Sequence, residues 1–187
     1  PTDHGFDEFF GVPGNTEDSL DTEPRIYLRN KEWTFKDRSK IKWAGIKHRE
    51  GQILTGHDWD LTKLGPNYLR EGIRFLERQA HSIKPFFLYY IPNSNHFQRN
   101  ENGDYAVPHS IAGVEIKGKS QYTDGSKGGE REDMVLENDV AFGALLQTLR
   151  DIDDPRSPGD KLIDNTLIIF TSDNGPNVGD NLGINQE

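Results

Sequence analysis

A short apolar run between turn residues is the feature that most constrains the fold of this chain. Residues 166–170 read Thr-Leu-Ile-Ile-Phe, and Asn-Gly-Pro follows at positions 174–176. A run this short and this apolar is typical of a strand that is buried on both faces inside a parallel sheet. Residues 85–91, Pro-Phe-Phe-Leu-Tyr-Tyr-Ile, have the same character and predict a second such strand.

A helix is predicted before each of these strands. Before the first strand, apolar side chains recur at the steps of an amphipathic helix, at Leu69, Ile73, Leu76 and Ala80. Pro66 suits the first turn of this helix. A second helix is predicted from about Glu130 to Asp151, and Pro155 prevents it from continuing much further. We therefore expect an α/β fold with a parallel or mixed sheet flanked by helices.

The rest of the chain has weaker patterns. Residues 25–29 predict a short strand that pairs with residues 32–35 across a turn. Residues 92–129 show no periodicity, and so long an irregular loop is uncommon unless it shapes a site. A length of 187 residues suits one domain, although a hydrophobic content of 33% permits only a thin core.

Charge and composition exclude several classes of function. The net charge of -9 argues against nucleic acid and anionic membrane surfaces as partners. The chain has no cysteine, so it has neither disulfides nor thiolate zinc sites. No apolar run approaches the length of a membrane span.

Polar side chains follow both predicted strands. Asp173 and Asn174 come directly after one strand, and His96 follows the other. Parallel strands would bring these residues to one edge of the sheet, where ligands gather. Carboxylate and amide oxygens suit calcium or magnesium, and an imidazole can bind an anion or transfer a proton. The alternatives are an Asp-Asn-Gly turn without metal and a solvated loop histidine.

Three blocks of sequence together resemble the sulfatase family, the formylglycine-dependent arylsulfatases of the alkaline phosphatase superfamily. They are Gly-Phe-Asp-Glu-Phe-Phe-Gly at residues 5–11, the strand at 85–91 followed by His96, and Asn-Thr-Leu-Ile-Ile-Phe-Thr-Ser-Asp-Asn-Gly at 165–175. The resemblance spans nearly the whole chain. It implies an alkaline-phosphatase-like fold, sulfate-ester hydrolysis, and a periplasmic or extracellular location.

The resemblance also implies roles for single residues. Asp173 and Asn174 match two ligands of the family's active-site calcium, and His96 matches a histidine that contacts the sulfate group and can protonate the departing alcohol. The implied nucleophile is a hydrated formylglycine. The implied partner is a sulfate-ester small molecule or a sulfated glycan, and Lys117, Lys119 and Lys127 in the long loop are candidates for contact with a polyanion.

The chain departs from the family at the nucleophile. The family derives formylglycine from a cysteine or serine in Cys/Ser-x-Pro-x-Arg, and this chain has no cysteine and no Ser-x-Pro-x-Arg. We therefore expect residues 1–187 to be part of a single sulfatase catalytic domain that lacks its N-terminal nucleophile segment and its C-terminal part. Such a fragment would be inactive alone and would bind calcium weakly or not at all. The alternatives are a non-catalytic binding module of the same fold, and a phosphodiesterase or phosphonate hydrolase of the same superfamily.

Overall fold

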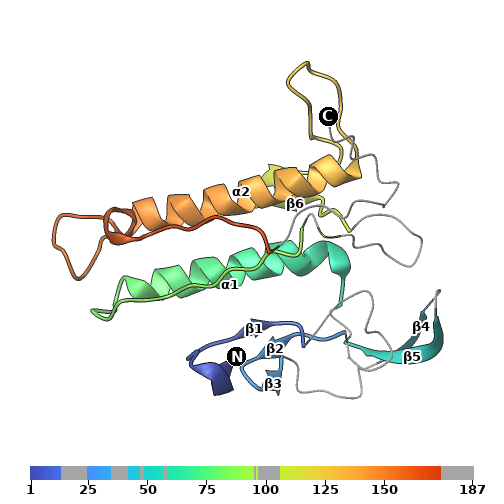
Figure 1. Ribbon diagram of the computed structural model, residues 1–187, viewed down its shortest axis with the longest axis horizontal. Coiled ribbons are helices and arrows are strands. Elements are labelled where there is room, and N and C mark those ends of the chain that lie inside the picture. Colours follow the sequence, from blue (N-terminus) through green and yellow to red (C-terminus); the bar gives the residue numbers. More distant parts are fainter. Residues whose placement is uncertain are drawn as a thin grey trace.

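The structure is a computed structural model in which two long helices form the centre of the molecule. It describes residues 1–13, 25–34, 42–46, 49–56, 59–94, 96 and 106–173, with the backbone alone for 42–46 and 49–55. Helix α1 spans Leu64–Gln79 and helix α2 spans Glu130–Asp151, and the two lie side by side (Figure 1). Both helices were predicted from the sequence, and the bounds of α2 agree with the prediction.

The two helices run in the same direction. A Cβ atom on Gly65 would face Glu137, and a Cβ atom on Gly72 would lie 3.2 Å from Leu145 Cδ2. From the first pair to the second, both helices advance toward their C-termini, by seven residues in α1 and by eight in α2. The N-termini of α1 and α2 are therefore at the same end of the molecule (Figure 1).

The core fills the space between these helices and the segments that cover them. Its buried residues include Leu76, Met134 and Leu162, each at most 1% exposed. The full set in this cluster is Leu69, Leu76, Val107, Ile111, Ile116, Met134, Ala141, Leu145, Leu149 and Leu162. A second cluster, built from Tyr27, Leu61, Leu64 and Ala106, joins the N-terminal sheet to the start of α1.

The strands of the described residues are short and antiparallel. The N-terminal sheet has the order β1 (Phe10–Gly11), β2 (Leu28–Arg29) and β3 (Glu32–Trp33), which confirms the pairing predicted around residues 30–31. The remaining strands form two hairpins, β4 (Lys42–Ile46) with β5 (Arg49–Thr55) and β6 (Ser110–Ile111) with β7 (Val114–Glu115). Short 3₁₀ turns are η1 (Thr2–His4), η3 (Leu61–Lys63) and η4 (Leu162–Asn165).

The expected parallel sheet is not seen among the described residues. Residues 85–91 have no strand partner there, and their exposure alternates along the segment. Phe86, Leu88 and Tyr90 pack against the core, whereas Phe87 and Tyr89 are 73% and 66% exposed. The prediction of burial on both faces was therefore wrong for this segment, because the helices cover only one face.

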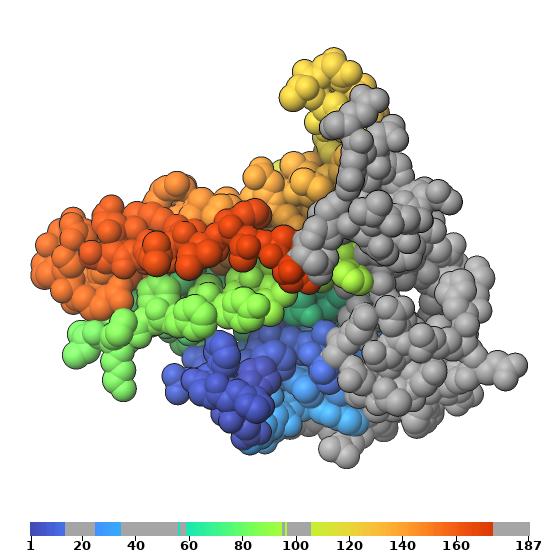
Figure 2. All heavy atoms as spheres, in the orientation of Figure 1, coloured from blue at the N-terminus to red at the C-terminus, as the bar shows by residue number. Residues whose placement is uncertain are grey.

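Residues 166–170 differ from the prediction in the same way. Leu167, Ile169 and Phe170 are 87%, 77% and 77% exposed. The Phe170 ring nevertheless lies 5.2 Å from the Phe142 ring of α2, so this segment runs back along the helix that precedes it. Figure 1 shows residues 85–93 and 166–173 running in the same direction, and Figure 2 shows both segments on one face of the molecule.

The long loop is more ordered than its sequence indicates. Its described part contains the β6–β7 hairpin and the buried residue Ile116. Asp133 of α2 accepts hydrogen bonds from the backbone N–H groups of Gly118 (2.6 Å) and Ser120 (3.0 Å). The loop is thus attached to α2 by a buried carboxylate.

The described part of the chain contains no helix that is both long and apolar enough to cross a lipid bilayer.

Candidate functional site

His96 lies in a turn that follows the extended segment 85–91. Its backbone N–H donates to the carbonyl oxygen of Asn93 over 3.3 Å, which closes the turn of residues 93–96. The histidine is exposed, whereas Ser94 in the same turn is buried. The turn therefore presents His96 at the surface and is anchored from inside by Ser94.

A buried carboxyl group of α2 holds Ser94. Glu137 is only 2% exposed, and its Oε2 accepts a hydrogen bond from the Ser94 hydroxyl. The neighbouring Asn138 donates from Nδ2 to the carbonyl oxygen of Ser94 over 3.1 Å. Burial raises the pKa of Glu137 to about 7, and the hydrogen bond from Ser94 opposes this rise.

Two further residues enclose the Glu137 carboxyl group. Gly65 of α1 lies so close that a Cβ atom there would be 1.8 Å from Glu137 Oε1. Burial raises the pKa of Tyr90, and the negative charge of Glu137 adds to that rise. Tyr90 Oη and Asn138 Oδ1 are buried, and neither atom has a hydrogen-bond partner in the part of the chain that is described.

The sequence analysis did not identify Glu137 or Ser94 as site residues. One signal could have found Glu137: it follows Met134 by three residues and precedes Ala141 by four. These steps place a carboxyl group on the buried face of the predicted helix.

Asp173 is exposed at the end of the second extended segment, where its Oδ1 accepts a hydrogen bond of 3.4 Å from the Ser172 hydroxyl. Asn174, the other predicted metal ligand, lies outside the described residues. The segments that lead to His96 and Asp173 both run toward the end of the molecule where α1 and α2 begin (Figure 1).

The carboxylate of Asp173 suits a hard cation such as calcium, which prefers six to eight oxygen ligands. However, the described residues contain no group of three or more histidine, aspartate or glutamate side chains that could hold a metal ion.

The lysines of the long loop mostly pair with acids nearby. Lys119 Nζ lies 2.8 Å from Glu115 and Lys117 Nζ lies 3.9 Å from Glu130. All these side chains are exposed or half-buried, so such pairs contribute little to stability and can rearrange around a ligand.

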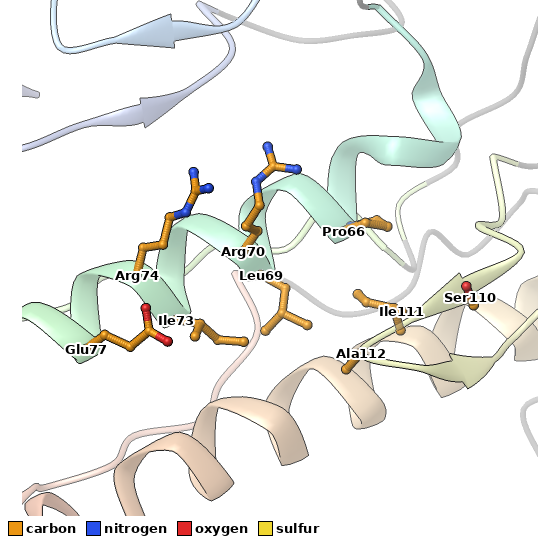
Figure 3. A pocket seen from close by; sticks show the side chains of 9 residues that line it. All are labelled: Pro66, Leu69, Arg70, Ile73, Arg74, Glu77, Ser110, Ile111 and Ala112. Carbon is orange, nitrogen blue, oxygen red and sulfur yellow. The ribbon is translucent and has the colours of Figure 1, made fainter. Parts of the chain in front are cut away.

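A surface groove lies between α1 and the β6–β7 hairpin (Figure 3). Its apolar floor includes Leu69, Ile73 and Ile111, and the side chains of Arg70 and Arg74 in Figure 3 point away from the hairpin. His96 and Asp173 are not among the residues that line it, so this groove is separate from the candidate site.

Comparisons with known proteins point to one family. The sulfatase family model matches residues 1–187. N-acetylgalactosamine-6-O-sulfatase of Bacteroides thetaiotaomicron is 35% identical over 94% of this chain and 35% of its own length. Human N-acetylgalactosamine-6-sulfatase is 28% identical over 94% of this chain and 27% of its own length. The canine enzyme of the same name is 27% identical over 98% of this chain and 30% of its own length.

The chain thus spans about a third of the length of the curated relatives it matches. No solved structure matches it. The match to the sulfatase family covers all 187 residues, which establishes membership of the family. This assignment does not depend on the described strands, which are antiparallel. An α/β fold of the alkaline phosphatase type is what this family implies. The chain belongs to the sulfatase family.

Proposed function

We propose that this chain is part of the catalytic domain of a sulfuric ester hydrolase that acts on sulfated sugars, with His96, Asp173 and Asn174 in its active site. The observation that carries the proposal is the match of the sulfatase family to residues 1–187. Relatives named for N-acetylgalactosamine 6-sulfate, among them one from Bacteroides and one human, supply the proposed substrate.

The geometry of the two extended segments supports a shared site. The Phe170 ring contacts Phe142, and Ser94 contacts Glu137 of the same helix. Extended chain advances about 3.3 Å per residue and a helix about 1.5 Å. The three residues from Phe170 to Asp173 therefore cover the length of about seven residues of α2. Starting beside Phe142, this segment runs back along α2 toward the helical turn that contains Glu137.

In this proposal His96 acts on the sulfate ester directly. Its imidazole would donate a hydrogen bond to a sulfate oxygen and would supply the proton that the departing alcohol oxygen needs when the S–O bond breaks. The exposed position of His96 in the turn of residues 93–96 makes it accessible to a substrate.

Asp173 and Asn174 would supply oxygen ligands to a calcium ion, completed by residues outside the described part of the chain. When bound, such an ion would offset negative charge on the sulfate oxygens. The proposed nucleophile is a formylglycine. Because these 187 residues contain no cysteine and no Ser-x-Pro-x-Arg, it would be supplied from outside them. We accordingly expect the 187 residues alone to hydrolyse no sulfate ester.

The test uses the natural polypeptide that contains these residues, produced together with a formylglycine-generating enzyme. The assay measures inorganic sulfate released from N-acetylgalactosamine 6-sulfate, with a phosphate diester as a second probe. Release of sulfate, with little turnover of the diester, is the expected result. Turnover of the diester alone would overturn the proposal in favour of a phosphodiesterase, and no turnover of either probe would favour a binding module.

A further inference from the structure

The described part of the chain contains three buried carboxyl side chains, and one of them has unusual partners. Asp133 accepts from backbone N–H groups, and Asp154 pairs with Arg156 at 2.7 Å. In this part of the chain Glu137 is paired with neither a cation nor a backbone N–H group, and its hydrogen-bond partner is the Ser94 hydroxyl. A carboxyl group is costly to bury without such partners, so Glu137 calls for a functional explanation.

We propose that Glu137 is a positioning residue of the active site, which holds the turn of residues 93–96 through Ser94 and thereby fixes where His96 lies. This inference rests on the role proposed above for His96.

Helix α2 holds Ser94 at two points. The Ser94 hydroxyl donates to Glu137 Oε2, and the Ser94 carbonyl oxygen accepts from Asn138 Nδ2 at 3.1 Å. One contact fixes the side chain and the other fixes the backbone of the same residue. Ser94 can therefore neither rotate nor shift along the helix without losing a buried hydrogen bond.

The hold on Ser94 extends to His96 through the backbone. The two residues share one turn, which is closed by the hydrogen bond from the His96 N–H group to the Asn93 carbonyl oxygen. No secondary structure holds this turn from the outside in the described residues, and His96 itself is exposed. The buried anchor at Ser94 thus constrains the backbone that carries His96.

The Glu137 side chain is packed tightly against α1. The backbone of α1 at Gly65 lies next to Glu137 Oε1, so close that a Cβ atom added to Gly65 would be 1.8 Å from this oxygen. Tyr90, from the extended segment that leads into the turn, interacts with Glu137 electrostatically. The carboxyl group is therefore enclosed by α1, by its own helix and by the segment that carries His96.

The protonation of Glu137 connects this anchor to pH. Burial raises the pKa of Glu137 to about 7. Among the described residues, Tyr90 is the ionisable group that interacts electrostatically with Glu137. Gly65 on α1 and Ser94 in the turn carry no charge. Because burial makes the folded site favour the protonated carboxyl group, loss of that proton should weaken the folded arrangement around Glu137. The turn should accordingly be held more tightly below pH 7 than above it.

The first experiment measures amide hydrogen exchange in the natural polypeptide that contains these residues. In Glu137→Ala and in Ser94→Ala, exchange at residues 94–96 should become about tenfold faster, the change that corresponds to one hydrogen bond. Asp133→Asn is the matched control, since Asp133 is equally buried on the same helix but holds residues 118–120 instead. It should accelerate exchange at 118–120 and leave 94–96 unchanged.

The second experiment measures the kinetics of sulfate release by the same variants. Glu137→Ala should lower kcat by about 10–100-fold through misplacement of His96, with KM changed by less than about threefold. Glu137→Gln keeps the size and a hydrogen-bond acceptor, so it should restore most of kcat. In the wild type, Glu137 should produce an inflection of the kcat–pH profile near pH 7. Glu137→Gln should abolish this inflection, whereas Asp133→Asn should keep it.

Two results would overturn the inference. One is unchanged exchange at residues 94–96 in both Glu137→Ala and Ser94→Ala, and the other is a loss of kcat in Asp133→Asn equal to that in Glu137→Ala. Exchange is measured without turnover, so it also separates the two proposals. A polypeptide that releases no sulfate contradicts the proposed function, while its exchange pattern still decides whether Glu137 holds the turn.

Discussion

Gly65 of α1 and Glu137 of α2 are in such close contact that only a residue without a side chain fits between the two helices at this level: a Cβ atom on Gly65 would lie 1.8 Å from Glu137 Oε1. The same carboxyl group holds Ser94. One carboxyl group of α2 therefore contacts both α1 and the turn that carries the candidate catalytic histidine.

The first prediction concerns this contact. Gly65→Ala should lower the free energy of unfolding by about 1–2 kcal/mol, because Glu137 must rotate away and lose its hydrogen bond with Ser94. Gly143→Ala is the matched control on α2, where an added Cβ atom meets nothing within 4 Å. It should stabilise the protein by about 0.5–1 kcal/mol through helix propensity. Denaturant unfolding measures both.

A double substitution sharpens this prediction. In a Glu137→Ala background, Gly65→Ala should no longer destabilise the protein, because its clash partner is gone. An equal loss of stability in both backgrounds would show that Gly65 is constrained by something other than Glu137.

The second prediction concerns pH. The folded protein keeps a proton on Glu137 up to a pKa of about 7, whereas the ordinary value is 4.5. Between these values the folded state binds a proton that the unfolded state has lost, so stability falls as pH rises through this window. The free energy of unfolding of the wild type, minus that of Glu137→Gln, should fall by on the order of 1–3 kcal/mol between about pH 5 and pH 7.5. Parallel curves for the two proteins would contradict the raised pKa.

The third prediction compares a core leucine with a leucine of the extended segment. In the 187-residue chain, Leu76→Ala should cost about 2–5 kcal/mol, because Leu76 is 1% exposed. Leu167→Ala should cost less than about 0.5 kcal/mol, because Leu167 is 87% exposed. Thermal or denaturant unfolding measures the difference. A large cost for Leu167→Ala would mean that another surface covers residues 166–170.

The fourth prediction concerns the attachment of the long loop to α2. Burial pushes the pKa of Asp133 up, but hydrogen bonds from Gly118 and Ser120 outweigh burial and lower it. Asp133→Asn should cost about 1–3 kcal/mol of stability, since it removes charge-assisted acceptors from these groups. Asp139→Asn, on the exposed side of the same helix, should change stability by less than about 0.5 kcal/mol. Similar effects of the two substitutions would argue against this attachment.

The helices could be predicted from the sequence because their signals are local. The stripe around Leu69 and Leu76 fixes α1, and α2 begins where the Gly129 N–H group donates to Glu132 Oε2 at 2.7 Å. The partners of the apolar runs could not be predicted in this way. An apolar run shows that a segment can be buried, but its burial depends on neighbours, and in the described residues 85–91 and 166–170 have helices on one side only.

The candidate site was predictable in part for the same reason. His96 follows the apolar run of residues 85–91 by five residues and Asp173 follows the run of residues 166–170 by three, so their places in the chain identify them as residues near segment ends. Glu137 makes its contacts with residues distant in sequence, Gly65 and Ser94, and only the packing of α1 against α2 brings them together. Asn174 lies outside the described residues, so its role stays a prediction.

The most direct test of the account compares two exposed histidines in the natural polypeptide that contains this chain. His96 follows the segment that leads to the candidate site, whereas His81 follows the C-terminal end of α1. Turnover of N-acetylgalactosamine 6-sulfate should fall by about 100-fold or more in His96→Ala, in keeping with the loss of a general acid. It should stay within about twofold of the wild type in His81→Ala. Wild-type turnover in His96→Ala, or equal losses in the two variants, would contradict the assignment of His96 to the active site.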